Sequence, residues 1–284
     1  MPTIAELEDG TRFTGRFACG RKDRMSARNG SPYLALELRD RTGALTARAF
    51  NDVDRLAARF EAGDAVEVTG KVVRFRGDRQ LEVSDVRRLD PGQVDPAEFL
   101  PAAYRSVEEL EGFLEHLARE IHDPGLAAVV RALLFEGPIA GEFRRAPCTR
   151  RGHHAYLGGL LEHTVAVGTL VGEVCQLHPR LDSDLLMAAA LLHDIGKTRE
   201  FRYAAAIELT DEGRLIGHLN LGAQLIAPAA TALPDDRRVA LMHCVLAHHG
   251  TEGRQPFGSA EAAALHRLNA LDATVKDALE HGLR

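Results

Sequence analysis

The segment Leu192-His193-Asp194-Ile195-Gly196-Lys197 has the clearest chemical potential in this sequence, because an imidazole and a carboxylate adjoin at the end of an apolar stretch. Neighbouring helical side chains diverge by about 100°, so His193 and Asp194 share a cation only if other segments supply further ligands. Suitable imidazoles and carboxylates occur at His163, His218, His248, His249 and Asp272. Such a set, without thiolates, is typical of a site where one or two divalent metals promote hydrolysis.

The composition is that of a folded protein with two differently charged parts. The 284 residues suffice for two domains with sizeable cores. The formal net charge is −6, with +2 over residues 1–92 and −8 over the remainder. This balance argues against a protein that coats nucleic acid with positive charge, although a local basic groove is compatible with it.

Four scattered cysteines without a C-x-x-C pair indicate free thiols in a reducing compartment, mostly packed as small hydrophobic side chains. No apolar run has the length of a membrane span, and the N-terminus lacks the layout of a signal peptide. We therefore expect a cytoplasmic protein with no membrane partner.

Residues 1–90 have the alternating, β-branched pattern of short strands separated by turns. A short helix at Val53–Glu61 is expected between the third and fourth of five strands, which are Thr11–Cys19, Tyr33–Arg39, Ala44–Phe50, Asp64–Val73 and Gln80–Asp85. This order is the layout of an OB-fold β-barrel. The segments Tyr33–Gly43 and Gly63–Gly70, together with Phe50, resemble those of OB modules that bind nucleic acid.

After residue 90 the apolar residues follow helical spacing. We expect a helical connector over residues 91–147 and an all-α bundle over residues 148–284, so the chain as a whole is a multidomain α+β protein. The expected helices include Val107–Ile121, Pro124–Phe135, a short piece ending at Arg145, one starting near Gly159, Leu215–Ala232, Arg237–Ala247 and Leu265–Leu279. Strand character is expected only around Ile207–Thr210, followed by a turn at Asp211-Glu212-Gly213.

The order His, His-Asp, His, His-His, Asp resembles the ligand series of the HD-domain metal-dependent phosphohydrolases. Within that superfamily, the segments Gly152–Thr164, Leu191–Lys197, Gly217-His218 and Ala247–Gly250 are similar to those of the YhaM-type 3′→5′ exoribonucleases. That family joins an N-terminal OB domain to a C-terminal HD domain, the order expected here over essentially the full length. One difference is the Arg150-Arg151 pair, which precedes Gly-His-His where the family often has a lysine.

The resemblance implies a metal-binding role for the whole histidine and aspartate series. A first cation would be held by His163, His193, Asp194 and Asp272. A second would be held by His218, His248 and His249, with Asp194 as the bridging carboxylate. Imidazole and carboxylate ligands together favour Mn²⁺, our first choice, or Fe²⁺, Co²⁺ or Ni²⁺ over Mg²⁺ and Ca²⁺.

Further residues near the series are candidates for catalysis and for contacts to substrate. A metal-bound water beside the shared carboxylate Asp194 would attack the phosphorus of the substrate. Lys197 would stabilise the charge that develops there. Arg150, His154 and Tyr156 are candidates for contacts to a substrate phosphate, and the last two could instead orient a metal ligand. In the barrel, aromatic side chains that stack on bases and arginines that follow phosphates are expected at Tyr33, Phe50, Arg74 and Arg76.

These features predict a metal-dependent hydrolase that shortens single-stranded RNA in preference to DNA, with the 3′→5′ direction implied by the resemblance alone. The same chemistry on a small molecule, as in a nucleotide phosphohydrolase or a cyclic-dinucleotide phosphodiesterase, is the alternative. A third interpretation is a non-catalytic single-strand-binding or sensor protein with a structural metal. The sequence leaves open whether the chain forms a homo-oligomer.

Overall fold

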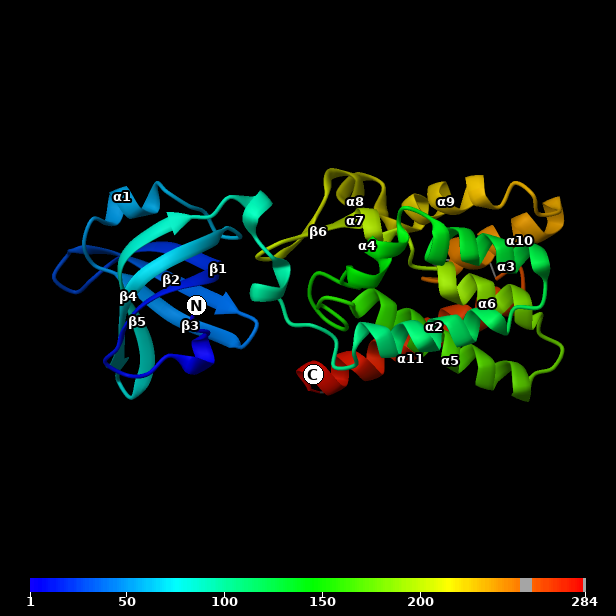
Figure 1. Ribbon diagram of the computed structural model, residues 1–284, viewed down its shortest axis with the longest axis horizontal. Helices are drawn as coiled ribbons and strands as arrows, with labels where there is room; N and C mark the ends of the chain where they lie inside the picture. Colours follow the sequence, from blue (N-terminus) through cyan, green and yellow to red (C-terminus); the bar gives the residue numbers. More distant parts are fainter. Residues whose placement is uncertain (251–256, 283–284) are drawn as a thin grey trace. The chain divides into compact units, whose positions relative to one another are not determined.

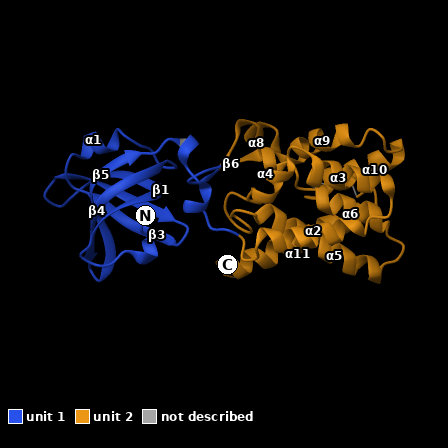
Figure 2. Cartoon of the chain, in the orientation of Figure 1, with its two compact units in different colours: residues 1–102, 203–207 blue, residues 103–202, 208–284 orange. Residues whose placement is uncertain are grey.

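The fold is described from a computed structural model, which covers residues 1–250 and 257–282 (Figure 1). The chain forms two compact units, one of residues 1–102 with 203–207 and the other of residues 103–202 with 208–284 (Figure 2). These boundaries differ from the three segments expected from the sequence, because residues 103–147 pack within the helical unit. The buried residues Leu110, Leu114 and Leu117 place their helix against the rest of that unit.

The first unit is a closed five-stranded barrel, which confirms the expected OB-fold. The strands follow one another around the barrel in the order β1-β2-β3-β5-β4, with β3 and β5 parallel and the other pairs antiparallel. A short helix α1 (Val53–Ala57) lies between the third and fourth strands, as expected, but it ends before Glu61. The strands are β1 (Arg12–Ser26), β2 (Pro32–Asp40), β3 (Gly43–Ala49), β4 (Ala65–Phe75) and β5 (Asp78–Arg88).

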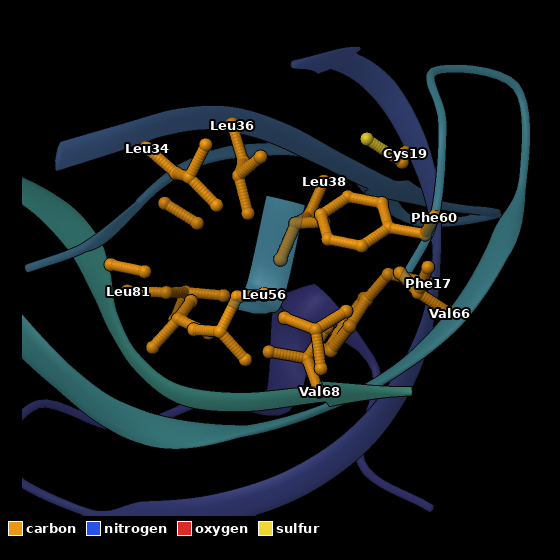
Figure 3. Close-up of a cluster of buried hydrophobic side chains, with 14 of the residues drawn as sticks. Phe17, Cys19, Leu34, Leu36, Leu38, Leu56, Phe60, Val66, Val68 and Leu81 are labelled. Atoms are coloured by element: carbon orange, nitrogen blue, oxygen red, sulfur yellow. The ribbon is translucent and has the colours of Figure 1, made fainter. Parts of the chain in front are cut away.

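The interior of the barrel is filled by the inward-facing residues of the alternating strands, as the period of two requires. In Figure 3, Leu34, Leu36 and Leu38 of β2 point toward the side chains of Val68 and Leu81 on the opposite wall. Leu56 of α1 and the neighbouring Phe60 close the core. Phe17 is fully buried there, so this aromatic side chain is part of the core and is not a surface for bases.

The second unit is helical, as expected for an HD domain, and a two-stranded hairpin has its ends in this unit and its residues 203–207 in the first. Asp211-Glu212-Gly213, expected as a turn, instead begins a short helix because the Thr210 hydroxyl accepts a hydrogen bond from the Gly213 amide and caps it. The elements are α2 (Val107–Arg119), α3 (Pro124–Arg131), η4 (Ala132–Glu136), α4 (Ala140–Arg145), α5 (Gly159–Leu177), α6 (Ser183–Leu192), α7 (Lys197–Glu200), β6 (Phe201–Tyr203), β7 (Ile207–Leu209), α8 (Asp211–Leu215), α9 (Gly217–Ala229), α10 (Asp235–Ala247) and α11 (Ala260–His281).

Helix α6 is the centre of this unit. Every residue from Leu185 to Leu192 is buried, and the helix packs against α2, α3, α5, α10 and α11. A helix that is apolar on all sides is stable only where other helices cover it completely. The polar residues that follow α6 are therefore delivered into the interior of the bundle. Among the described residues, no helix combines the length and the hydropathy needed to cross a membrane.

Candidate metal centre

The turn after α6 brings His193 and Asp194 beside residues of α5, α9 and α11 and the end of α10. The side chains of His193 and Asp194 are 0% and 1% exposed, so neither reaches solvent directly. The backbone then tightens, with the Lys197 amide donating to the Asp194 carbonyl at 2.9 Å. Gly196 has no side chain where one would overlap the carbonyl of His218 at the start of α9. The glycine thus permits the close approach that places His218 beside Asp194.

One carboxylate oxygen of Asp194 faces two imidazoles. Its Oδ2 lies 3.3 Å from His193 Nε2 and 3.5 Å from His163 Nε2 on α5, and these two nitrogens are 3.2 Å apart. The amide oxygen of Asn269, on α11, is 3.0 Å from the same His163 nitrogen. Nitrogens bound to one transition metal at about 2.0–2.1 Å would lie about 3 Å apart. The spacing of this group, the Oδ2 cluster, therefore fits a single cation.

The other oxygen, Oδ1, faces a second set of imidazoles, the Oδ1 cluster. It lies 3.4 Å from His248 Nε2 and 3.6 Å from His218 Nε2, and His249 Nε2 is 2.8 Å from His218 Nε2. All four side chains offer a ligand atom within a sphere suited to one ion. Asp194 Oδ1 and His248 Nε2 are buried and have no hydrogen-bond partner. Buried polar atoms without partners are costly, and a cation would satisfy both.

Backbone and carboxylate acceptors set which nitrogen of each histidine is free. His193 Nδ1 donates to the Ala190 carbonyl at 2.8 Å, and His248 Nδ1 donates to the Val245 carbonyl at 2.6 Å. His218 Nδ1 is held by Glu200 at 3.1 Å. Because each Nδ1 carries its proton toward these acceptors, each Nε2 presents a lone pair to the cavity. Facing lone pairs repel one another unless a cation lies between them.

A second layer of polar residues orients His163 from behind. Asp272, expected as a ligand of the first cation, accepts a hydrogen bond from His163 Nδ1 at 2.6 Å, on the side of the ring away from His193. His154 Nε2 donates to the same Asp272 oxygen at 3.0 Å, and its Nδ1 lies 3.1 Å from Glu162. Tyr156 donates to Glu162. The structure thus places Asp272, His154 and Tyr156 behind His163, where they can hold its ring in position.

The position of Asn269 was not expected from the sequence. Asn269 and Asp272 are three residues apart on α11 and share one helical face, so the sequence offers both oxygens at the same edge of the bundle. Only the rotation of α11 decides that the amide points to His163 Nε2 and the carboxylate to Nδ1. The signal was present in the spacing, but an asparagine is a weaker candidate for a metal ligand than an aspartate.

The electrostatics favour a positive charge in this cavity. Although burial opposes ionisation, the Lys197 ammonium holds the pKa of Asp194 well below its usual range. Burial lowers the pKa of both His163 and His248 to about 4, so these imidazoles are neutral at pH 7. Lys197 Nζ lies 2.7 Å from Asp194 Oδ2 and supplies a positive charge that offsets this carboxylate directly.

The cluster opens into a cavity of about 450 Å³. Arg150, expected to contact substrate, is exposed at this cavity and can approach a phosphate there. Glu162, Asp272 and His154 instead line a separate, more apolar depression. The first cavity is bounded by Cys148, Thr149, Arg150, His153, Lys197, Glu200, Phe201, Leu209, His218, His248, His249, His266, Asn269, Ala270 and Ala273.

On the barrel, two of the expected aromatic side chains meet on the surface. The rings of Tyr33 and Phe50 are 5.7 Å apart, and the Arg48 guanidinium lies 5.4 Å from Tyr33 and 4.9 Å from Phe75. Arg76 lies 5.4 Å from the Phe75 ring. Phe50 and Phe75 are 49% and 45% exposed, so part of each ring is accessible to bases. We call Tyr33, Arg48, Phe50, Phe75 and Arg76 the aromatic–arginine surface.

The expected contact Arg74 is not part of this surface. Its side chain pairs with Asp9 and donates to the Gly77 carbonyl at 3.2 Å. Arg48 belongs to the aromatic–arginine surface, although this was not expected from the sequence. Its position follows from the strand register, because β3 runs beside β2 and brings Arg48 opposite Ala35, two residues from Tyr33.

Known proteins resemble this chain along nearly its whole length. The protein named 3′-5′ exoribonuclease YhaM of Listeria welshimeri is 30% identical over 259 residues, which cover 88% of this chain and 81% of that protein. The protein of the same name from Oceanobacillus iheyensis is 30% identical over 279 residues, covering 95% and 86%. The chain belongs to the YhaM family. A third member, from Bacillus velezensis, is 31% identical over 253 residues, covering 87% of this chain and 80% of that protein.

Two domain models divide this YhaM-family chain in the same way as the fold. The OB-fold nucleic acid binding domain matches residues 18–89, which span most of the barrel. The HD domain matches residues 160–281, which include every histidine and aspartate of the two clusters. The second OB-fold domain of replication protein A from Methanococcus maripaludis also aligns with 31% of this chain and 94% of its own, at 21% identity and a TM-score of 0.27.

The residues of this YhaM-family chain fit the divalent metals that an HD domain implies. Unprotonated imidazole nitrogens, a shared carboxylate and an amide oxygen converge with few hydrogen-bond donors among them. Neutral nitrogen ligands combined with carboxylate oxygen suit first-row transition metals. The two unpartnered buried atoms, Asp194 Oδ1 and His248 Nε2, would both be satisfied by such an ion.

Proposed function

We propose that this protein is a metal-dependent 3′→5′ exoribonuclease that hydrolyses phosphodiester bonds in single-stranded RNA. The observation that carries the proposal is the arrangement of Asp194, whose two oxygens each face a separate set of imidazoles. Two ions held by one bridging carboxylate suit the displacement of an oxygen at phosphorus. The direction of degradation and the preference for RNA rest on the names of the family members.

Each cluster has a defined place in this proposal. His163, His193 and Asn269, with Asp194 Oδ2, would hold one cation, while His218, His248 and His249, with Asp194 Oδ1, would hold the other. Asp272 remains a candidate ligand in its expected role, although its hydrogen bond to His163 Nδ1 favours an orienting role. Metals bound at these residues would supply Lewis acidity and would make a water nucleophile available at neutral pH.

The protein's own residues prepare the phosphate for attack. Lys197 and Arg150 line the cavity and contribute positive charge toward the non-bridging oxygens. The fixed Nδ1 hydrogen bonds of His193 and His248 keep both rings oriented and unprotonated at Nε2. His154 holds Asp272, which in turn holds His163, so two side chains act in series on one ligand.

The identity of the metal and the surface that binds the strand are further parts of the proposal. Mn²⁺ is our first choice, with Fe²⁺, Co²⁺ and Ni²⁺ as close competitors, because the clusters combine imidazoles with oxygen donors. For the strand, the aromatic–arginine surface offers exposed rings flanked by guanidinium groups, which suits stacking on unpaired bases. This surface by itself does not distinguish one base sequence from another, so we expect the protein to accept strands of many sequences.

A 5′-labelled RNA oligomer incubated with the protein and Mn²⁺ tests the proposal. We expect a ladder of progressively shorter strands that is absent with His193→Ala. The exposed His116, on α2 and outside the cavity, provides the matched control, since His116→Ala should leave the ladder unchanged. RNA that stays intact with Mn²⁺, Co²⁺ and Mg²⁺ would overturn the proposal.

Two further arms test the substrate. A strand whose 3′ end is chemically blocked should persist, whereas its degradation would contradict the proposed direction. Efficient hydrolysis of a mononucleotide or cyclic dinucleotide, without shortening of RNA, would instead support the small-molecule alternative. We also propose a cytoplasmic location, which the free state of all four cysteines supports. A homo-oligomer is tested by the mass of the protein in solution.

A further inference from the structure

Cys148 lies in the metal centre, although the sequence suggested only a small hydrophobic role for the cysteines. Its side chain is fully buried on the segment between α4 and α5 and lines the same cavity as Lys197 and Asn269. Its Sγ is 3.8 Å from Asp194 Oδ2 and 3.4 Å from Lys197 Nζ. Cys148, His163 and Asp194 each offer a ligand atom within 4.8 Å of the others.

This grouping differs from a lone thiol in an apolar core. Lys197 donates both to Asp194 Oδ2 and to Cys148 Sγ, so a positive charge already occupies the space between the carboxylate and the sulfur. A divalent cation that displaced the ammonium from that space would meet the sulfur, the carboxylate oxygen and the free Nε2 of His163. Sulfur is a soft ligand, and its presence shifts the preference of a site toward thiophilic metals.

We propose that Cys148, His163 and Asp194 form a subsite that binds a thiophilic divalent cation, of the Zn²⁺ or Cd²⁺ class, within the metal centre. On binding, the cation replaces the thiol proton, which leaves to solvent, and a sulfur–metal bond forms without any change of oxidation state. The subsite uses His163 and Asp194 Oδ2, which belong to the Oδ2 cluster. A thiophilic ion would therefore compete with the ion of that cluster.

Cadmium provides a direct test, because a thiolate bound to Cd²⁺ gives an ultraviolet charge-transfer band that nitrogen and oxygen ligands do not give. The background is a full-length variant in which Cys19, Cys175 and Cys244 are changed to alanine, so that Cys148 is the one remaining thiol. Titration of this metal-free variant with Cd²⁺ should produce the band. Adding Cys148→Ser should abolish it and weaken Cd²⁺ binding by at least about tenfold.

Binding of Mn²⁺ supplies the internal control. Mn²⁺ prefers oxygen and nitrogen ligands, so Cys148→Ser should change Mn²⁺ affinity by no more than about twofold. Failure of the band to appear with Cys148 present, or its persistence after Cys148→Ser, would overturn the proposal. An equal loss of Mn²⁺ and Cd²⁺ affinity would also overturn it, because that result indicates a general structural role for the side chain.

The wild-type protein gives a second measurement that does not depend on how the variants fold. In ¹¹³Cd NMR, a resonance in the downfield range of sulfur-bound cadmium is expected, and a spectrum confined to the range of nitrogen and oxygen ligands contradicts the subsite. Selective ¹⁵N labelling of histidine should show coupling of the same cadmium to His163. Neither measurement uses RNA, so the outcome is independent of whether the protein is an exoribonuclease.

Discussion

Replacement of Asp194 by asparagine is the perturbation with the largest expected effect on the metal-free protein. Lys197 is 6% exposed, and its ammonium lies 2.7 Å from the Asp194 carboxylate. Removing one partner of a buried ion pair costs about 3–5 kcal/mol, because the other charge is left without compensation. The cost has an upper bound, since the lysine can instead lose its proton. Deprotonation of a lysine that has an ordinary pKa costs about 4.6 kcal/mol at pH 7.

The thiol beside Lys197 cannot replace the carboxylate. Burial raises the pKa of Cys148 to about 12, so the thiol is neutral at pH 7. We therefore expect Asp194→Asn to lower the free energy of unfolding of the helical unit by about 3–5 kcal/mol. Urea unfolding in the presence of a chelator measures this change, with helical circular dichroism as the signal. The barrel can unfold separately, so the two transitions must be fitted independently.

A double variant separates the charge effect from a loss of packing. Lys197→Met removes the uncompensated ammonium, so Asp194→Asn with Lys197→Met should regain most of the lost stability. The matched control is Asp235→Asn, because Asp235 pairs with Arg238 at 2.8 Å but its side chain is 88% exposed. That change should alter stability by less than about 1 kcal/mol.

The stability and the activity of these variants should diverge. Asp194 would be shared by both cations, so the double variant should stay at least about 100-fold less active on RNA despite its restored stability. The reasoning fails if Asp194→Asn is within 1 kcal/mol of the wild type, or if Lys197→Met gives no recovery.

Three further predictions concern protonation, packing and metal removal. Burial lowers the pKa of folded His163 and His248 to about 4, so the unfolded chain binds more protons between about pH 6.5 and 4. The urea midpoint of the metal-free protein should therefore fall as the pH is lowered through that range, and a flat profile would contradict the assignment. Gly196→Ala should destabilise the helical unit by at least about 1–3 kcal/mol through overlap with the His218 carbonyl, whereas Gly112→Ala, in open space on α2, should be neutral or stabilising in the same urea assay. Chelation should abolish RNA hydrolysis, and Mn²⁺ at a hundredfold excess over its Kd should restore it and add about 2.7 kcal/mol of stability by calorimetry; hydrolysis that survives chelation would argue against a metal-dependent reaction.

The elements of the chain could be predicted from its sequence because local patterns determine them. The strands of the barrel alternate with a period of two, and α6 was recognisable as an uninterrupted apolar run. The short helix α8 was missed because its cap is a single hydrogen bond from the Gly213 amide to Thr210. The extent of the helical unit was also missed, because only packing shows that α2 belongs with α5.

The candidate site was predictable in its residue types but not in its geometry. His163, His193 and Asp194 converge as the spacing suggested, whereas the roles of Asn269 and Asp272 depend on the rotation of α11. A difference of three residues on one helix decides which oxygen faces Nε2 and which faces Nδ1. Cys148 was missed for a different reason, since its contact with Asp194 joins segments 46 residues apart.

The donor atoms of the centre are held in an arrangement that their own interactions do not favour. Nε2 of His163 and Nε2 of His193 face each other at 3.2 Å, and Asp194 Oδ1 and His248 Nε2 have no partner. These costs are sustained because α6 is covered on all sides and the Nδ1 hydrogen bonds prevent the rings from turning away. Rings held in this way are already oriented when a cation binds, so the cost of holding them reappears as affinity for metal.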